Sequence, residues 1–213
     1  MTHLLAPTPE YFIELYNCQG HVAYAGEPVV HLAHAWQCGQ LALYAEASPH
    51  LQLACWLHDL GHLLGQSGDT PTLAGHNDQH EQVGADLIES LWGPLVAEPV
   101  RLHVQAKRYL VKRNPHYFDR LSDDSRRSLA LQGGAMSDAE CAAFECSPHH
   151  KPALLLRVWD EQAKQAGWFA RSANAALAQL RLVMSQVPLL SPPRPAMGTE
   201  MGSDRVVSVT HLP

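Results

Sequence analysis

ACWLHDLGHLLG, residues Ala54 to Gly65, is the stretch that decides the fold. Apart from His58, Asp59 and His62 it is apolar almost all round, which is typical of a buried helix. A carboxylate buried in such a helix without a partner would be costly, so Asp59 requires a cation beside it. Neighbouring side chains on a helix diverge by about 100°, so the His58-Asp59 pair can reach two ions, with Asp59 bridging them. We therefore expect a metal site inside a helix over residues 50–64.

Outward from this helix, the spacing of apolar residues predicts further helices and few strands. Expected helices cover residues 32–47, 50–64, about 77–92 and 96–112, a short piece near Tyr117, residues 122–132 and 137–145, and one long helix over 152–184. Ser48-Pro49, Gly93-Pro94 and Asn114-Pro115 supply stops. The pattern predicts an all-α helical bundle with one domain over residues 1–187. Residues 188–213 are rich in Pro, Gly and Ser and are expected to form a tail without its own core.

Composition limits the classes of partner. The 213 residues are 46% hydrophobic and carry a net charge of −6, with 15 Lys and Arg that form no basic block. Nucleic-acid binding is therefore not expected, and a small molecule is the better candidate partner. No run approaches about 20 apolar residues and no signal pattern opens the chain, so we expect a cytoplasmic protein without membrane segments. The five cysteines show no metal-type pairing and are expected to be reduced.

Histidine is unusually frequent, with 14 residues, and several histidines fall on successive predicted helices. The candidate metal ligands are His34, His58, Asp59, His80, His103 and Asp160. Any one of them alone would more often be a hydrogen-bonded core residue, but the ordered set is hard to produce by chance. Imidazole with carboxylate suits iron, manganese or zinc rather than calcium or magnesium. No metal role is expected for His3, His50, His116, His149, His150 or His211.

Five segments resemble the metal-binding segments of the HD-domain superfamily. They read HLAHAWQ, ACWLHDLGHLLG, HNDQHEQVGADLI, LHVQAKRYL and LLRVWDEQAK. Most members of that superfamily are phosphohydrolases, whereas a small clade uses a mixed-valence di-iron centre to cleave phosphonates with oxygen. His80 and His103 would give a second metal its own imidazoles, which favours the di-iron clade.

A second resemblance concerns HVAYAGEPVV, which is similar to the Tyr-x-Gly-Glu-Pro segment of the phosphonate-cleaving oxygenases. It implies that Tyr24 covers one iron until substrate displaces it and that Glu27 helps receive the substrate. Lys107 lies four residues after His103 and shares its helix face. By the same resemblance His62 and Lys107 would bind the phosphonate, with Ser125 and Arg157 as further contacts. Arg157 could equally be a structural ion-pair residue.

The resemblance implies an O2-dependent enzyme with two iron ions, Fe(II) and Fe(III). Its substrate would be a 1-hydroxy-2-aminoethylphosphonate or the trimethylammonium analogue, giving phosphate and glycine or glycine betaine. The amine stays open, because Glu27 could pair with either cation. The aromatic faces that could surround a quaternary ammonium are Tyr24, Trp36, Tyr109 and Tyr117.

Two alternatives remain at this point. One is a divalent-metal phosphohydrolase acting on a nucleotide or phosphate ester, in which a metal-bound hydroxide would attack. The other is a degenerate HD domain that serves as a binding module, although the full ligand set argues against it. The sequence leaves open the choice between iron and manganese, the stereochemistry at the carbinol and the oligomeric state.

Overall fold

The computed structural model describes residues 7–24, 26–64 and 72–190, which form an all-α bundle. Its elements are α1 (Pro9–Gln19), α2 (His31–Tyr44), α3 (Pro49–Leu57), the 3-10 helix η1 (Leu60–Leu64), α4 (His80–Trp92), α5 (Pro94–Arg113), α6 (Pro115–Arg120), α7 (Asp123–Leu131), α8 (Asp138–Glu145), α9 (His150–Gln162) and α10 (Ala173–Ser185). Between these elements one isolated antiparallel bridge joins Ala23 to Val30. The predicted all-α class is confirmed.

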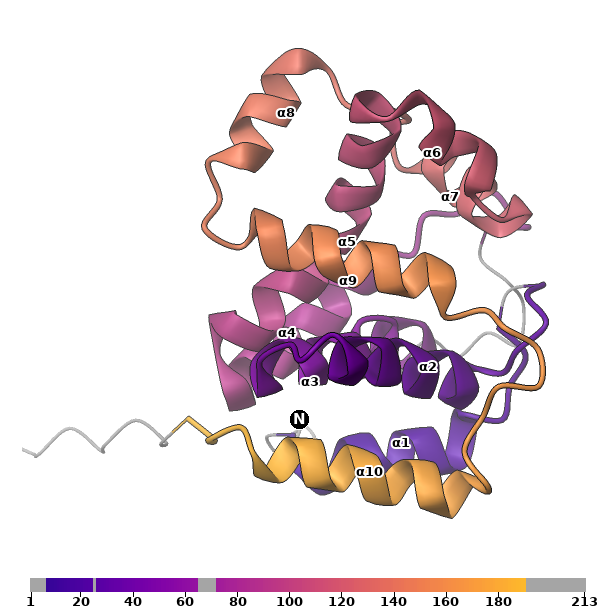
Figure 1. Cartoon of the computed structure of the whole chain (residues 1–213), viewed down its shortest axis with the longest axis vertical. Helices are drawn as coiled ribbons and strands as arrows, with labels where there is room; N and C mark the ends of the chain where they lie inside the picture. The colour runs from indigo at the N-terminus through magenta and orange to yellow at the C-terminus, as the bar shows by residue number, and fades with distance from the viewer. Residues whose placement is uncertain (1–6, 25, 65–71, 191–213) are drawn as a thin grey trace, which may run out of the picture.

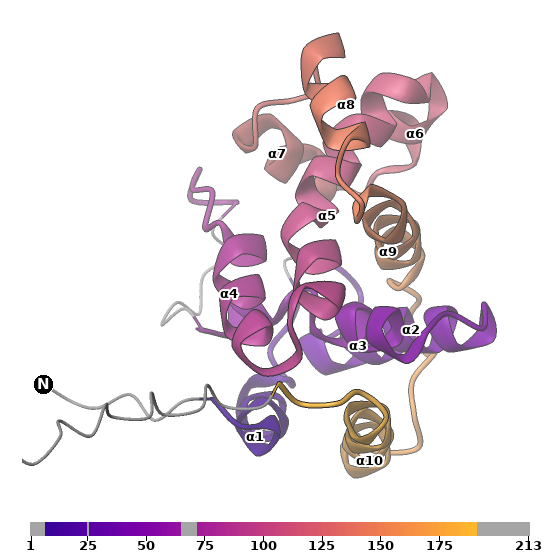
Figure 2. The same cartoon turned by 90° about the vertical axis from the view of Figure 1, so that its left-hand side faces the viewer.

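The helices stack in tiers along the long axis of the molecule (Figure 1). At the lower end α1 lies beside α10, the middle holds α2 and α3, and α9 crosses above them. The turned view shows α4 beside α5, with α6, α7 and α8 at the upper end (Figure 2). Because α5 packs on both α4 and α9, it links the middle tier to the upper one. None of the helices in the described ranges combines the length and apolarity needed to cross a bilayer.

The main core surrounds α3, as its sequence predicts. Leu53, Trp56, Leu57 and Leu60 are almost fully buried. A smaller apolar cluster lies under α8, around Phe144. Burying a large apolar side chain contributes about 1.5–3 kcal/mol, so α3 anchors the bundle and fixes the position of whatever follows it.

The predicted continuous helix over residues 50–64 is wrong at the point that matters most. The α-helix ends at Leu57, His58 and Asp59 lie in a turn, and the chain continues as a 3-10 helix. The His62 N–H donates to the Asp59 carbonyl at 3.1 Å, an i to i+3 bond that tightens the backbone. The cause is tertiary, because Gly61 packs directly on the backbone of His80.

The predicted single helix over residues 152–184 is also wrong, because it is two helices, α9 and α10, joined by residues 163–172. Gly167 has a φ of +77°, which no α-helix accommodates. The Gln37 side chain on α2 takes over the backbone groups of this linker by donating to the carbonyls of Gln165 and Trp168. Ser172 then caps α10. The sequence pattern did not reveal this break, because apolar periodicity continues on both sides of it.

Smaller differences concern helix ends. The structure adds α1, which the sequence prediction did not include and which Thr8 caps. Helix α4 begins at His80 rather than near Asn77, because Gln79 has a left-handed φ of 52°. The proposed tail begins at Pro188, but residues 191–213 lie outside the described residues, so the domain boundary at 187 remains a prediction.

Candidate metal and anion site

Four of the predicted ligands meet in one buried set, formed by α2, the turn after α3, and α9. The Nε2 atoms of His34 and His58 lie 3.1 Å apart. Asp59 Oδ2 lies 3.4 Å from each of these nitrogens, and Asp160 Oδ1 lies 3.3 Å from His34 and 3.6 Å from His58. Donor atoms bound to one ion at about 2.1 Å lie roughly 3.0–3.4 Å apart, so this set has the dimensions of a metal site. We call it the first ligand set.

The remaining two imidazoles form a second set on the other oxygen of the same carboxylate. The Nε2 atoms of His80 and His103 lie 3.2 Å apart. Asp59 Oδ1 is 3.5 Å from the first and 3.6 Å from the second. Asp59 therefore faces one imidazole pair with each oxygen, which is the geometry of a bridging carboxylate. We call His80, His103 and Asp59 Oδ1 the second ligand set.

Hydrogen bonds at the back of the rings determine the tautomers. The Nδ1–H groups of His34, His58 and His103 donate to the carbonyls of Ala163, Cys55 and Val100 at 2.7–2.9 Å. His80 Nδ1 instead donates to Asp78 Oδ1 at 2.9 Å. A carbonyl or carboxylate oxygen only accepts, so each Nδ1 carries the proton and each Nε2 directs a lone pair at the centre. Metal-ligating histidines typically show this arrangement.

The residues present fit a metal on two further observations. Lone pairs of paired Nε2 atoms facing each other at 3.1–3.2 Å repel unless a cation lies between them. Asp160 Oδ1 is buried and lacks a hydrogen-bond partner among the described residues. Burial alone would raise the pKa of Asp160, but the positive charge of the Arg157 guanidinium outweighs it, and that pKa lies well below its ordinary value. The carboxylate is therefore ionised and available.

Two glycines let η1 reach the start of α4 and so determine where His80 lies. A Cβ on Gly61 would collide with the His80 carbonyl oxygen. Gly84, one turn further along the same face of α4, also approaches Gly61, with 3.3 Å between its ideal Cβ position and the Gly61 nitrogen. This close approach brings the second ligand set to Asp59, and any side chain at Gly61 would separate them.

Tyr24 covers the first ligand set. Its hydroxyl donates to Asp59 Oδ2 at 2.6 Å, and its ring stacks on His34 with the centroids 4.3 Å apart. Burial, followed by the negative charge of Asp59, raises the pKa of Tyr24 well above its ordinary value, so the phenol is protonated. A molecule entering toward the first set must displace this hydroxyl.

Opposite the carboxylates, Lys107 supplies a buried positive charge from α5. Its Nζ donates to Ser128 Oγ at 2.7 Å, and the residue is only 4% exposed. Burial, followed by repulsion from Arg157, lowers the pKa of Lys107 to about 7. Among the described residues the Lys107 ammonium has only this hydroxyl as hydrogen-bond partner, and a bound anion would compensate its burial.

The Arg157 guanidinium is bound to carboxylates rather than directed into open space. One guanidinium nitrogen donates to Asp160 Oδ2 and another to Glu161, while Nε donates to the Tyr117 hydroxyl at 2.9 Å. A further contact of 3.3 Å reaches Ser125 Oγ. Arg157 thus orients Asp160 toward the first ligand set. Of the two roles that the sequence left open, the geometry favours the structural one, although Arg157 also lines the cavity.

Sequence reasoning missed Lys164, which forms an ion pair with Glu27. Its Nζ lies 3.1 Å from Glu27 Oε1 and donates to Ser125 Oγ at 3.1 Å. Lys164 also lies 5.9 Å from the centroid of the Tyr24 ring. Its spacing of four residues after Asp160 on a predicted helix was the available signal. Glu27 is therefore engaged by a cation before any substrate arrives.

Sequence reasoning also missed Asp78, in the segment that precedes α4. Its Oδ2 accepts from His62 Nδ1 at 2.6 Å, while its Oδ1 accepts from His80. Burial alone would lower the pKa of His62, but the hydrogen bond to Asp78 and the charge of Asp59 outweigh it and raise that pKa. An acidic residue two positions before a ligand histidine was the available signal.

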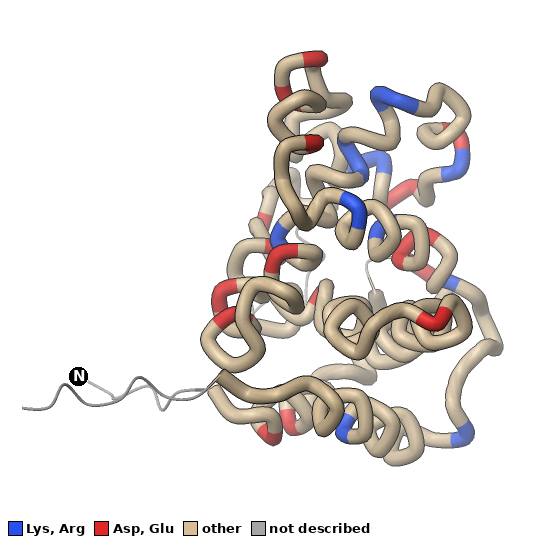
Figure 3. The backbone as a smooth tube through the Cα atoms, turned by 60° about the vertical axis from the view of Figure 1, so that its left-hand side comes forward, with Lys and Arg blue, Asp and Glu red and all other residues tan. Residues whose placement is uncertain are grey.

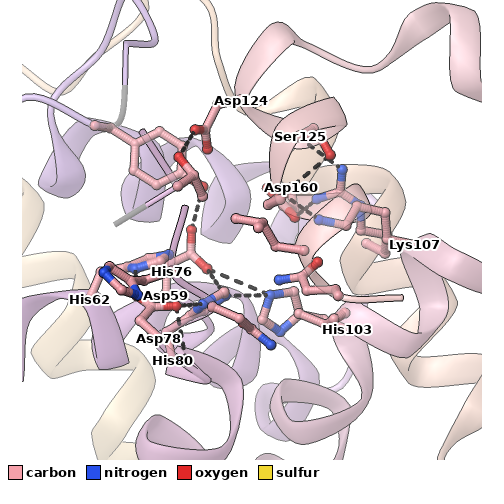
Figure 4. Close-up of a pocket in the computed structure, with 18 residues that line it drawn as sticks. Asp59, His62, His76, Asp78, His80, His103, Lys107, Asp124, Ser125 and Asp160 are labelled. Carbon is pink, nitrogen blue, oxygen red and sulfur yellow. Dashed lines mark hydrogen bonds and ion pairs between the residues drawn. The ribbon is translucent and has the colours of Figure 1, made fainter. Parts of the chain in front are cut away.

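One cavity lies between Asp59 and Lys107 (Figure 4), and Glu27 and Lys164 are not part of its lining. Figure 4 shows His62, Asp78 and His80 on one side, with Lys107 and Ser125 on the other. Tyr24, Asp59, His103, Arg157 and Asp160 also line it. Its volume of about 30 Å³ accommodates about two water molecules, so a substrate enters only if Tyr24 or a neighbour moves. Trp36 and Tyr109 do not belong to the cavity lining: Trp36 bonds Gln179 and Tyr109 bonds Glu145.

Fold and site together define an all-α protein with a buried His/Asp cluster able to hold metal, next to a basic, anion-accepting wall. No family model matches the chain. The chain is 46% identical over 142 residues to hydroxymethylphosphonate dioxygenase from Gimesia maris, which covers 66% of this chain and 71% of that protein. It is 35% identical over 157 residues to 1-hydroxy-2-(trimethylamino)ethylphosphonate dioxygenase (glycine-betaine-forming) from Leisingera caerulea, covering 74% and 80%.

A third relative is an uncharacterised protein of Acanthamoeba polyphaga mimivirus, 36% identical over 154 residues, which cover 71% of this chain and 70% of that protein. These identities extend over more than two thirds of each relative. The chain therefore belongs to the family of phosphonate-cleaving dioxygenases. It is an oxygenase-type enzyme, which confirms that prediction over the phosphohydrolase and the binding module. The individual ligand and substrate roles remain predictions.

Proposed function

We propose that the chain uses O2 and two iron ions to split the carbon–phosphorus bond of a small 1-hydroxyphosphonate. The reaction is R–CH(OH)–PO3H2 plus O2 giving R–COOH plus phosphoric acid, in which substrate supplies all four electrons. The observation that carries the proposal is Asp59, whose two oxygens face separate imidazole pairs, within the same cavity as Lys107. A plain anion-binding pocket would not require such a bridge.

The first ligand set would hold one ion and the second set the other. Unequal ions bound there would supply Lewis-acid binding of the substrate hydroxyl and reaction with O2. Iron is preferred over zinc because zinc has no redox chemistry, and the two named relatives are dioxygenases. The HD-domain assignment remains a prediction from the resemblance.

The protein's own groups would bind and orient the phosphonate. Lys107 would bind one phosphonate oxygen, because its charge lacks a carboxylate partner among the described residues. His62 would bind another from the opposite wall, and Ser125 with Arg157 would border the same anion. Tyr24 would leave Asp59 as the substrate hydroxyl arrives, because both require the same position over the first set. Until then Tyr24 would exclude water from that position.

The substituent on the carbinol carbon has two candidates. An amino or trimethylammonium group, as the resemblance implies, would be received by Glu27, and one relative is named for the trimethylamino substrate. Hydroxymethylphosphonate is the second candidate, since the 46% identical relative is named for it. The small cavity and the Glu27–Lys164 ion pair also favour a small uncharged substituent. Of the four aromatic residues considered for a quaternary ammonium, Tyr24 lines the cavity, whereas Trp36, Tyr109 and Tyr117 lie outside its lining.

The test is a parallel assay of iron-loaded protein. O2 uptake and phosphate release are followed with hydroxymethylphosphonate, 2-amino-1-hydroxyethylphosphonate and its N-trimethyl analogue. Phosphate release matched one-to-one by O2 uptake is expected, and the substrate with the highest kcat/KM identifies the substituent. Phosphate release from ordinary phosphate esters without O2 would contradict the proposal. Protein with Asp59→Ala serves as the blank, because it lacks the bridge.

A further inference from the structure

Asp78 differs from the other acceptors behind the ligand imidazoles. His34, His58 and His103 each use a backbone carbonyl, which the fold holds rigidly. His80 uses the Asp78 carboxylate instead, and the same carboxylate binds His62. One side chain thus supports both His80, in the second ligand set, and His62, which is proposed to bind the phosphonate.

The two imidazoles that Asp78 supports also contact each other. The rings of His62 and His80 stack with 3.8 Å between centroids and 23° between planes. Asp78 spans the outer edge of the stack, with Oδ1 on one ring and Oδ2 on the other, and Figure 4 shows the three residues together. Since both oxygens are engaged, a rotation of the carboxylate would turn both rings.

We propose that Asp78 is a positioning residue that ties the anion-binding imidazole of His62 to the metal-ligating imidazole of His80. By accepting from Nδ1 of each ring, Asp78 keeps the Nε2 of His80 turned toward the second ligand set and the Nε2 of His62 turned toward the cavity. The orientation of the anion is thereby set relative to the second ion. This inference rests on the proposed function insofar as it takes His80 as a metal ligand.

Because of Glu81, the loss of Asp78 should affect His80 and His62 to different extents. Its Oε2 is buried without a hydrogen-bond partner among the described residues and lies 3.7 Å from His80 Nδ1. It is therefore a replacement acceptor for His80. Within the described ranges, no hydrogen bond or ion pair joins Glu81 to His62. Removal of Asp78 should consequently disturb anion binding more than metal retention.

The experiment uses the full chain loaded with iron and three variants. Asp78→Ala removes both bonds, whereas Asp78→Asn keeps an amide oxygen that can accept from one ring only. Asp86→Ala is the matched control, because Asp86 lies on α4 like His80 but pairs with Arg101 at the surface. Readouts are Kd for inorganic phosphate under anaerobic conditions, the rate at which a chelator removes each iron, Tm, and KM against kcat.

For Asp78→Ala we expect phosphate Kd and KM to rise roughly 10- to 100-fold, the size typical of lost outer partners of metal-ligating histidines. Iron in the second ligand set should be released several-fold faster, whereas iron in the first set should be unchanged. Asp78→Asn should give intermediate values and Asp86→Ala wild-type values. Wild-type phosphate Kd in Asp78→Ala, or equal loss of both irons with a lowered Tm, would overturn the proposal.

These readouts separate the inference from the proposed function. If the wild-type protein fails to couple phosphate release to O2 uptake, the proposed reaction is wrong, yet phosphate Kd and iron release still measure what Asp78 does. If coupling is observed and Asp78→Ala behaves like Asp86→Ala, the reaction stands and the positioning role is rejected.

Discussion

The parts of the sequence before and after Arg101 contribute differently to the site: both supply candidate ligands, but only the second supplies lysine and arginine. Before Arg101 the chain contains no Lys or Arg, and this part supplies His34, His58, Asp59 and His80. Every lysine and arginine comes from Arg101 onward. Figure 3 shows the basic positions gathered mainly over the upper part of the bundle. The cavity lies where an imidazole and carboxylate region meets a basic one.

The two regions handle buried charge differently. In the first, backbone carbonyls and carboxylates hold the rings so that lone pairs and negative oxygens converge, which requires cations. In the second, Arg157 and Lys164 already have carboxylate partners, but Lys107 has only the Ser128 hydroxyl among the described residues. An unpaired buried charge is costly, so these groups favour a metal cation on one side of the cavity and an anion on the other. A substrate with a hydroxyl group next to a phosphonate group matches a cavity that has imidazoles and carboxylates on one side and Lys107 on the other.

The largest effect should come from removing Asp59, the carboxylate that both ligand sets share. Asp59→Ala removes a carboxylate from both ligand sets, so bound iron should fall from two ions per chain toward none. Activity should fall roughly a thousandfold or more, because metal ions contribute several kcal/mol. Metal analysis and O2 uptake measure both. His103→Ala should lose the second ion alone, and retention of both ions in Asp59→Ala would refute the bridge.

The second largest effect should come from removing the charge of Lys107, on the basic side of the cavity. Lys107→Met keeps the length and removes the charge, and hydrogen bonds to charged groups contribute about 1.5–3 kcal/mol, so kcat/KM should fall roughly 10- to 150-fold. The iron content should stay at two ions per chain. Ser128→Ala is the matched control and should have a smaller effect, since it leaves the ammonium in place. An unchanged KM in Lys107→Met would show that the anion binds elsewhere.

The pH dependence of kcat/KM tests the role of Lys107 in a second way. The pKa of Lys107 is lowered to about 7, chiefly by burial, so the free enzyme carries the ammonium below that pH and loses it above. Therefore kcat/KM should fall by up to about tenfold per pH unit above 7, whereas kcat changes less because bound phosphonate favours the ammonium. In Lys107→Met this limb should be absent. Substrate ionisation affects both proteins equally, so the difference between their profiles isolates Lys107.

The smallest expected effect concerns the ion pair that joins the two regions. Glu27→Gln removes the acid but keeps its shape. With hydroxymethylphosphonate, kcat/KM should change less than about threefold, because that substrate has no cation and the Gln amide oxygen can still accept from Lys164. With 2-amino-1-hydroxyethylphosphonate, a loss of about tenfold is expected if Glu27 receives the amine through a charge-assisted hydrogen bond. Equal changes with both substrates would mean that Glu27 acts only through Lys164.

How far prediction reached can be seen at His58 and Asp59. They became candidate ligands because they are polar residues inside an apolar run, and the structure brings them together with His34 and Asp160. Their backbone conformation could not be predicted from the sequence, because apolar periodicity alone continues the helix through them. The turn exists because Gly61 packs on the backbone of His80, and that contact joins segments that no local pattern connects.

The linker between α9 and α10 shows the same limit. Both flanks have helical periodicity, and Gly167 alone is a weak break signal. Gln37 replaces the missing helix bonds from a distance of 128 residues in sequence. The break also exposes the Ala163 carbonyl, which His34 uses to set its tautomer.

The sequence by itself determined the all-α class and six candidate ligands, because periodicity and residue types whose burial requires a partner can be read locally. Tyr24 was singled out by the resemblance to the phosphonate-cleaving oxygenases, and Lys107 by its spacing from His103 together with that resemblance. The sequence suggested Asp59 as a bridge, but only the tertiary structure decided which imidazole pair each of its oxygens faces. It also decided that Glu27 is already paired with Lys164 and that Asp78 joins His62 to His80. Such pairings depend on how helices pack, because side chains far apart in sequence compete for the same partners.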